Sequence, residues 1–105
     1  MSGKKTFPYP LTYEGTPHEH RDRELVAMTD IIAQYREDNA KYYRLGSAQE
    51  GRALINEALT NLDREIYSKT KADRDPEEIR KRAVKLAVAA MRFIVDVCMT
   101  EAWKA

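Results

Sequence analysis

Three cations in the last third of the chain have the spacing of one helical face. Arg82, Lys85 and Arg92 are separated by three and seven residues, so a helix would carry them on one side. Such a row can hold phosphate groups, to which arginine donates two parallel hydrogen bonds. Alternatively, the row is a solvated face that contributes little to stability. In that case its cations pair with acids of the preceding helical segment, namely Glu57, Asp63 and Glu65.

Aromatic and polar residues elsewhere could complete a ligand site. Tyr9 and Tyr13 could stack on a nucleobase, because every base has a flat face. Asn56, Glu57 and Thr60 fall on the same or adjacent helical turns and could contact polar groups of a ligand. The alternative for the two tyrosines is that they fasten the N-terminal segment to the helices, which is the commoner use of aromatic side chains.

The sequence predicts no metal site and no catalytic nucleophile. His18 and His20 are two residues apart and would point to different sides of a helix, and two histidines without a third ligand rarely bind zinc. Cys98 follows an apolar pattern and is expected to be a small buried residue. A glycine-rich phosphate loop, a nucleophile elbow and a paired-cysteine motif are all missing. These residues favour binding over catalysis.

Composition limits the partners and the compartment. The chain has 105 residues, enough for one domain, and a net charge of +1 that argues against binding of bulk nucleic acid. A single cysteine permits no internal disulfide and indicates a reducing compartment. The most apolar stretch, 83–99, contains three charged residues and indicates a buried helix, not a membrane span. We therefore expect a cytoplasmic protein with no membrane partner.

Three start signals predict three long helices. Each combines a capping residue with a proline, an acid or both in the first turn. The signals are Thr16-Pro17-His18-Glu19, Ser47-Ala48-Gln49-Glu50 and Asp75-Pro76-Glu77-Glu78. We expect helices over 17–45, 48–70 and 76–102, with Gly46 ending the first in a left-handed conformation. Residues 1–15 hold two of the four prolines and are expected to form an extended arm, leaving 16–105 as the helical domain.

Apolar periodicity supports an all-α antiparallel bundle and suggests a partner copy. The first helix would align Leu25, Met28, Ile32, Tyr35 and Tyr42. The third would carry two stripes: Ile79, Ala83, Leu86, Ala90, Phe93 and Val97 on one side, and Val84, Val88, Met91, Val95 and Cys98 on the other. A helix that is apolar on two sides must be covered from two sides, so we expect a homodimer or higher homo-oligomer. Alternatively, the aromatic arm covers the second stripe.

The order of these segments resembles the MazG-like all-α nucleoside-triphosphate pyrophosphohydrolases, especially short phage-borne members. The run from Arg36 to Tyr42 is similar to the end of that family's first helix. The run from Ala53 to Leu62 is similar to the second helix, which carries E-E-x-x-E, and the run from Arg82 to Ala90 is similar to the next, which carries E-x-x-D. The similarity covers about 70 residues, and helical bundles share such patterns.

This resemblance implies a binding protein that has lost the family's reaction. In the family, the acids bind magnesium, which activates water to cleave a nucleoside triphosphate. Here the first motif reads Asn56-Glu57-x-x-Thr60 and the second reads Arg82-x-x-Lys85. Cations at the ligand positions would repel the metal by several kcal/mol each, at ~4 Å and an effective dielectric near 20. The same cations suit direct capture of a phosphate without metal.

A second resemblance concerns phage cyclic-nucleotide sponges, which are small helical oligomers with an aromatic, proline-containing N-terminal arm. Phe7-Pro8-Tyr9-Pro10 and Lys85-Leu86-x-x-Ala89-x-Met91 are similar to parts of that group. It implies a phage-encoded anti-defence protein acting in the host cytoplasm.

The sequence therefore predicts a non-enzymatic protein that binds a nucleotide or cyclic nucleotide and needs no cofactor. Arg82, Lys85 and Arg92 would hold the phosphates, while Tyr9 or Tyr13 would stack on the base. One alternative is a magnesium-dependent pyrophosphohydrolase that uses Glu57 and Glu65. The other is a helical protein-interaction module that inhibits a host defence complex.

Overall fold

The computed structural model describes residues 17–105, and every regular element among them is helical. The three long helices are α1 (Pro17–Lys41), α2 (Ala48–Tyr67) and α3 (Pro76–Phe93). Three short elements are a 3-10 turn at Lys71–Asp73, a π-helical turn at Ile94–Cys98 and a 3-10 helix at Glu101–Lys104. The predicted all-α class is confirmed. The expected arm, with Tyr9 and Tyr13, and the cap at Thr16 lie outside the described residues.

Two of the predicted helix starts are confirmed by their hydrogen bonds. The Ser47 side-chain oxygen accepts from the backbone N–H of Glu50 at 3.1 Å. The Glu50 carboxylate accepts in return from the N–H of Gly46 at 2.9 Å, one residue before the cap. At α3, the Asp75 carboxylate accepts from the N–H of Glu77 at 3.0 Å, and a proline occupies the first turn. Side-chain oxygens thus satisfy amides that have no partner inside a helix.

The first helix ends earlier than predicted, at Lys41 and not at 45. Gly46 has no positive φ, so the predicted left-handed stop is wrong. The connection that follows is held by α3 and the π-helical turn. Arg92 donates from Nη2 to the carbonyl of Tyr43 at 2.7 Å, and Asp96 accepts from the N–H of Leu45 at 3.1 Å. These long-range bonds replace the helical hydrogen bonds that local sequence would favour.

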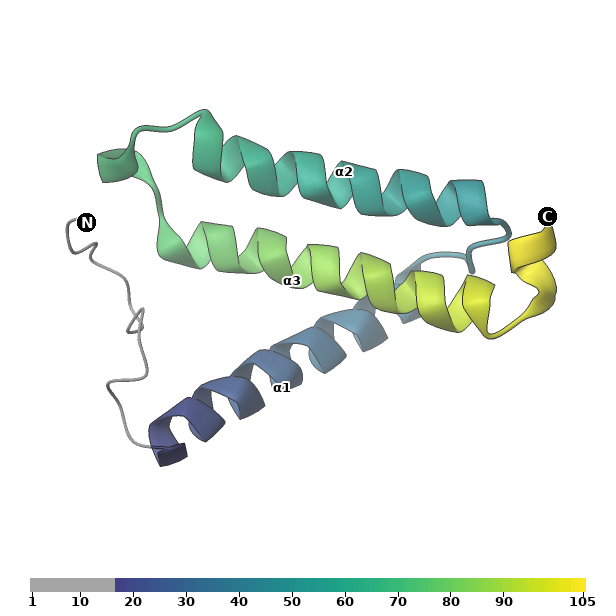
Figure 1. The fold of residues 1–105 in the computed structure, drawn as a ribbon, viewed down its shortest axis with the longest axis horizontal. Helices are drawn as coiled ribbons and strands as arrows, with labels where there is room; N and C mark the ends of the chain where they lie inside the picture. Colours follow the sequence, from purple (N-terminus) through teal and green to yellow (C-terminus); the bar gives the residue numbers. More distant parts are fainter. Residues whose placement is uncertain (1–16) are drawn as a thin grey trace.

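In space, α3 lies between the other two helices (Figure 1). It runs antiparallel to α2 and parallel to α1, as the order of the α1 contacts shows. Asp30 of α1 pairs with Arg80 of α3, and Asp38, later on α1, pairs with Lys85, later on α3. The two helices therefore run in the same direction. The helices α1 and α2 barely touch each other. A groove over α3 is the consequence of this arrangement.

Small residues make up the buried core of the described part. Val88 and Val97 are fully buried, and Ala58 and Ala89 are nearly so. At Gly51, which is buried, a Cβ would overlap the ring of Phe93, so α2 approaches α3 closely only because glycine has no side chain. The apolar stripe predicted for α1 is largely uncovered, since Leu25 is 54% and Met28 59% exposed. Dimerisation stays a prediction.

The π-helical turn changes which residues of the last helix are buried. The N–H of Met99 donates to the carbonyl of Ile94, five residues earlier, at 2.9 Å. This wider turn adds a residue and shifts the helical register. Asp96 and Val97 are buried, whereas Cys98 is exposed. The prediction that Cys98 is buried is therefore wrong. Among the described helices, none has the length and apolarity to cross a membrane.

Candidate functional site

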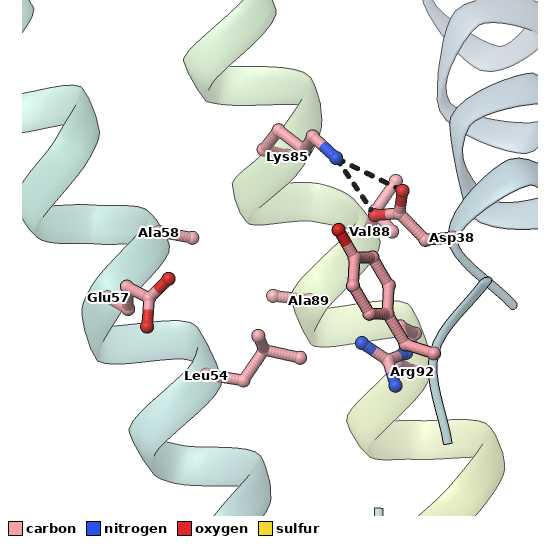
Figure 2. Close-up of a pocket in the computed structure, with 9 residues that line it drawn as sticks. Asp38, Leu54, Glu57, Ala58, Lys85, Val88, Ala89 and Arg92 are labelled. Atoms are coloured by element: carbon pink, nitrogen blue, oxygen red, sulfur yellow. Dashed lines mark hydrogen bonds and ion pairs between the residues drawn. The ribbon is translucent and has the colours of Figure 1, made fainter. Parts of the chain in front are cut away.

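A pocket of about 300 Å³ lies where α1 and α2 flank α3 (Figure 2). All three helices contribute to its lining: Asp38, Tyr42, Leu54, Glu57, Ala58, Lys85, Val88, Ala89 and Arg92. The volume falls at the lower end of the range for small-molecule sites, about 300–1,000 Å³. An apolar floor with a few charged groups around it is also typical of such sites.

The apolar floor of the pocket is formed by side chains of the buried core, and their small size explains why the pocket lies there. Val88 and Ala89 of α3 are 1% and 3% exposed, and Ala58 of α2 is 9% exposed. These side chains are short, so the helices leave space above them that no larger residue fills. Leu54 extends the apolar surface along α2 (Figure 2). The face of a flat aromatic ring would lie against this surface without desolvating polar atoms of the protein.

Lys85 is already paired inside the protein. Its ammonium nitrogen lies 3.0 Å and 3.2 Å from the two carboxylate oxygens of Asp38. Gln34 also donates to Asp38 at 2.8 Å, and Asp38 is only 7% exposed. The alternative in which the cations pair with acids of α2 is therefore wrong for Lys85, whose partner is on α1. This ion pair leaves Lys85 with little net charge to offer a ligand.

Arg92 is a buried cation with few partners. It is 5% exposed, and of the five N–H groups of a guanidinium one, on Nη2, donates to a described residue, the Tyr43 carbonyl. The Nε atom is buried and has no hydrogen-bond partner in the described part of the chain. The guanidinium carbon lies 5.8 Å from the centre of the Tyr42 ring, a weak cation–π contact. A buried charge without a counter-ion is costly.

Glu57 is the second unpaired charge of the pocket. Figure 2 shows its carboxylate extending from α2 toward the space above Ala89. It makes no hydrogen bond or ion pair with any residue that the structure describes. The four charges around the pocket thus divide into one internal pair, Asp38 with Lys85, and two separate groups, Arg92 and Glu57.

The predicted site residues are only partly brought together. Lys85, Arg92 and Glu57 line the pocket. Arg82 is half-buried on α3 but is not among the lining residues. Asn56 and Thr60 are exposed on α2 and bond to each other within the helix, the Thr60 hydroxyl donating to the Asn56 carbonyl at 2.9 Å. Sequence reasoning missed Asp38 and Tyr42 as site residues, because nothing local to them indicates contact with α3.

The described residues contain no group of three or more histidine, cysteine, aspartate or glutamate side chains placed to hold a metal ion. Glu65, which the magnesium-dependent alternative would need, pairs at 2.7 Å with Lys69, just past the end of α2. The hydrogen bond from Lys69 to Glu65 raises the pKa of that lysine above its ordinary value. The described part of the chain thus offers the pyrophosphohydrolase alternative no set of metal ligands.

No protein-family model, no curated protein and no solved structure matches this chain. The resemblances to MazG-like enzymes and to cyclic-nucleotide sponges therefore stay predictions, as do a phage origin and an anti-defence role.

Proposed function

We propose that this chain is a non-enzymatic nucleotide-binding protein and that the pocket between the three helices is its ligand site. The observation that carries the proposal is the guanidinium of Arg92, which is buried at the pocket wall and donates only one of its five N–H groups to a residue of the described range 17–105. A phosphate would supply the missing counter-charge. It would also accept hydrogen bonds from N–H groups on the Nη atoms that bond to no described residue.

Lys85 lies about two turns before Arg92 on α3 and supports the same assignment. Its side chain is 45% exposed, whereas that of its partner Asp38 is 9% exposed. The ammonium group can therefore keep its bond to Asp38 and still face an incoming anion, since lysine has three donors. A phosphate between Lys85 and Arg92 would accept a hydrogen bond from each residue, and the charge of Arg92, which no described carboxylate offsets, would make its bonds the stronger ones.

The size of the pocket favours a single nucleotide over a cyclic dinucleotide. A volume of about 300 Å³ accommodates one base and its phosphate more readily than two of each. The apolar floor at Val88 and Ala89 would accept the face of the base. The pocket volume thus supports a ligand with one base, linear or cyclic, over a cyclic dinucleotide.

Calorimetric titration without metal tests the proposal. The protein is titrated with mononucleotides, cyclic mononucleotides and cyclic dinucleotides, and we expect heat for at least one mononucleotide. Arg92→Gln should weaken that ligand at least about tenfold, the loss of one charged contact. Arg82→Gln removes the same charge from α3 outside the pocket lining and should leave affinity unchanged. Absence of heat with every nucleotide would refute the proposal.

Because Arg92 also holds the Tyr43 carbonyl, its substitution could perturb the fold. Circular dichroism melting shows whether Arg92→Gln remains folded. Lys85→Gln provides a second variant that leaves the connection after α1 intact, and it should weaken the same ligand by a smaller factor. Equal affinity of Lys85→Gln, Arg82→Gln and the unaltered chain would remove Lys85 from the site.

We also propose that the chain forms a homodimer through the first half of α1. Leu25, Val26 and Met28 are all about half exposed or more, at 54%, 47% and 59%. A cluster of large apolar side chains on one helix of a small protein is typical of an interaction surface. Sedimentation analysis over a range of concentrations should show a dimer that Met28→Glu dissociates. Asn39→Glu, an exposed position at the other end of α1, is the control and should remain dimeric.

A further inference from the structure

The two unpaired charges of the pocket lie on different helices, and together they restrict the chemistry of the ligand. Arg92 comes from α3 and Glu57 from α2, and both line the same apolar floor (Figure 2). Neither forms an ion pair with any residue in the described part of the chain. A ligand that satisfies both must carry an anion at one end and N–H donors at the other.

The two groups belong to different helices, and no ion pair joins them. A ligand can therefore meet each group with a separate end. A nucleotide carries its phosphate and the hydrogen-bonding edge of its base at opposite ends.

The carboxylate of Glu57 distinguishes among the bases. An ionised carboxylate only accepts hydrogen bonds, through two oxygens. Guanine presents two adjacent N–H donors, N1–H and the 2-amino group, that match these two oxygens. Adenine and cytosine place a ring-nitrogen acceptor beside their amino group, and uracil flanks its single N–H with carbonyl oxygens. In those bases an acceptor would face the carboxylate without a proton between them.

We infer that the pocket selects guanine nucleotides, with Glu57 accepting from the guanine edge and Arg92 binding the phosphate. This inference rests on the proposed function and adds the identity of the base. The Asp38 carboxylate offsets the charge of Lys85. The phosphate of the ligand therefore meets one positive charge that is not already offset, on Arg92. A monophosphate suits this balance better than a triphosphate.

Titration with guanosine, inosine and adenosine monophosphates tests the inference. Guanosine monophosphate should bind about 5- to 150-fold more tightly than adenosine monophosphate, the discrimination of one good bidentate contact. Inosine monophosphate, which lacks the 2-amino group, should be intermediate. In Glu57→Gln the preference for guanine should fall to less than threefold. Asp63→Asn removes an acid from the same helix outside the pocket lining and should retain the preference.

Other outcomes separate failure of the inference from failure of the proposed function. Equal affinity for all bases would overturn guanine selection and leave nucleotide binding standing. If deoxyguanosine monophosphate binds weakly and Glu57→Gln affects all ribonucleotides alike, the carboxylate contacts the ribose hydroxyls, and guanine selection is again wrong. Saturable binding of free arginine with no binding of any nucleotide would overturn both proposals. Glu57 is exposed on α2, so its amide variant is expected to fold.

Discussion

Alanine at position 51 should separate the effect of helix propensity from that of packing. Alanine is intrinsically better than glycine inside a helix by about 1 kcal/mol. A Cβ on Gly51, however, would lie 2.7 Å from Cε2 of Phe93 and overlap the adjacent ring carbon. Relieving such an overlap costs about 1–3 kcal/mol. We expect Gly51→Ala to lose up to about 2 kcal/mol of unfolding free energy, because the clash is at least as large as the gain in propensity.

Thermal and urea unfolding measure the balance between propensity and packing in four proteins. These are the unaltered chain, Gly51→Ala, Phe93→Ala and the variant with both substitutions. Gly51→Ala alone should lower the melting temperature by up to roughly 16 °C, at about 4–8 °C per kcal/mol for a domain of this size. In a Phe93→Ala background, where the ring is missing, the same substitution should instead stabilise by about 1 kcal/mol.

The second glycine of the described region provides the control for this experiment. A Cβ on Gly46 would meet only the Glu50 carboxylate, at 3.7 Å, an ordinary contact. Its φ is not positive, so alanine can adopt the same backbone conformation. Gly46→Ala should therefore stabilise the fold by about 0.4–1 kcal/mol, because alanine lowers the conformational entropy of the unfolded chain. If Gly51→Ala raises the stability of the otherwise unaltered protein, the close approach of α2 and α3 at Phe93 is wrong.

Three further predictions concern charged residues. Lys85→Met should cost about 1–3 kcal/mol of unfolding free energy, because it leaves the buried Asp38 carboxylate without its cation. Asp38→Asn should cost less, because the Lys85 side chain is 45% exposed and its ammonium group reaches water. Equal losses of unfolding free energy for the two variants in urea would contradict this difference. Asp96→Ala should cost about 1–3 kcal/mol by removing the acceptor of a backbone amide after α1, and proton exchange at that amide should accelerate. Glu65→Gln should lower the raised pKa of Lys69, which NMR titration measures. The stabilisation from this pair is complete below the ordinary lysine pKa and is lost as pH rises through the pKa of the folded protein. An unchanged Lys69 pKa in the variant would contradict Glu65 as the cause of the shift.

Local signals predicted the helices well, whereas long-range contacts decided their ends. The starts at Ser47 and Asp75 follow from side chains that cap amides two or three residues away, and such bonds can be predicted from the sequence. The end of α1 at Lys41 depends on Arg92 and Asp96, which lie about 50 residues further along the chain and leave no local trace.

The candidate site was predictable only as a face of a helix. Helical spacing grouped Arg82, Lys85 and Arg92, but it could not indicate that the pocket lining includes the last two and omits the first. Asp38 belongs to a mixed-charge segment with no motif, and its pairing with Lys85 is a tertiary contact. The exposure of Cys98 depends on a π-helical turn, which an apolar pattern of ordinary helical period cannot reveal.

Since α1 contacts α3 and barely touches α2, residues 17–105 divide into two structural units of unequal cooperativity. The α2–α3 hairpin can stay folded while α1 detaches, so α1 is the element most prone to sub-global opening. Native-state hydrogen exchange should then show the amides of 20–37 exchanging before those of α2. Detachment of α1 would also remove the pocket wall that contains Asp38, so a ligand bound against that wall should slow exchange throughout α1.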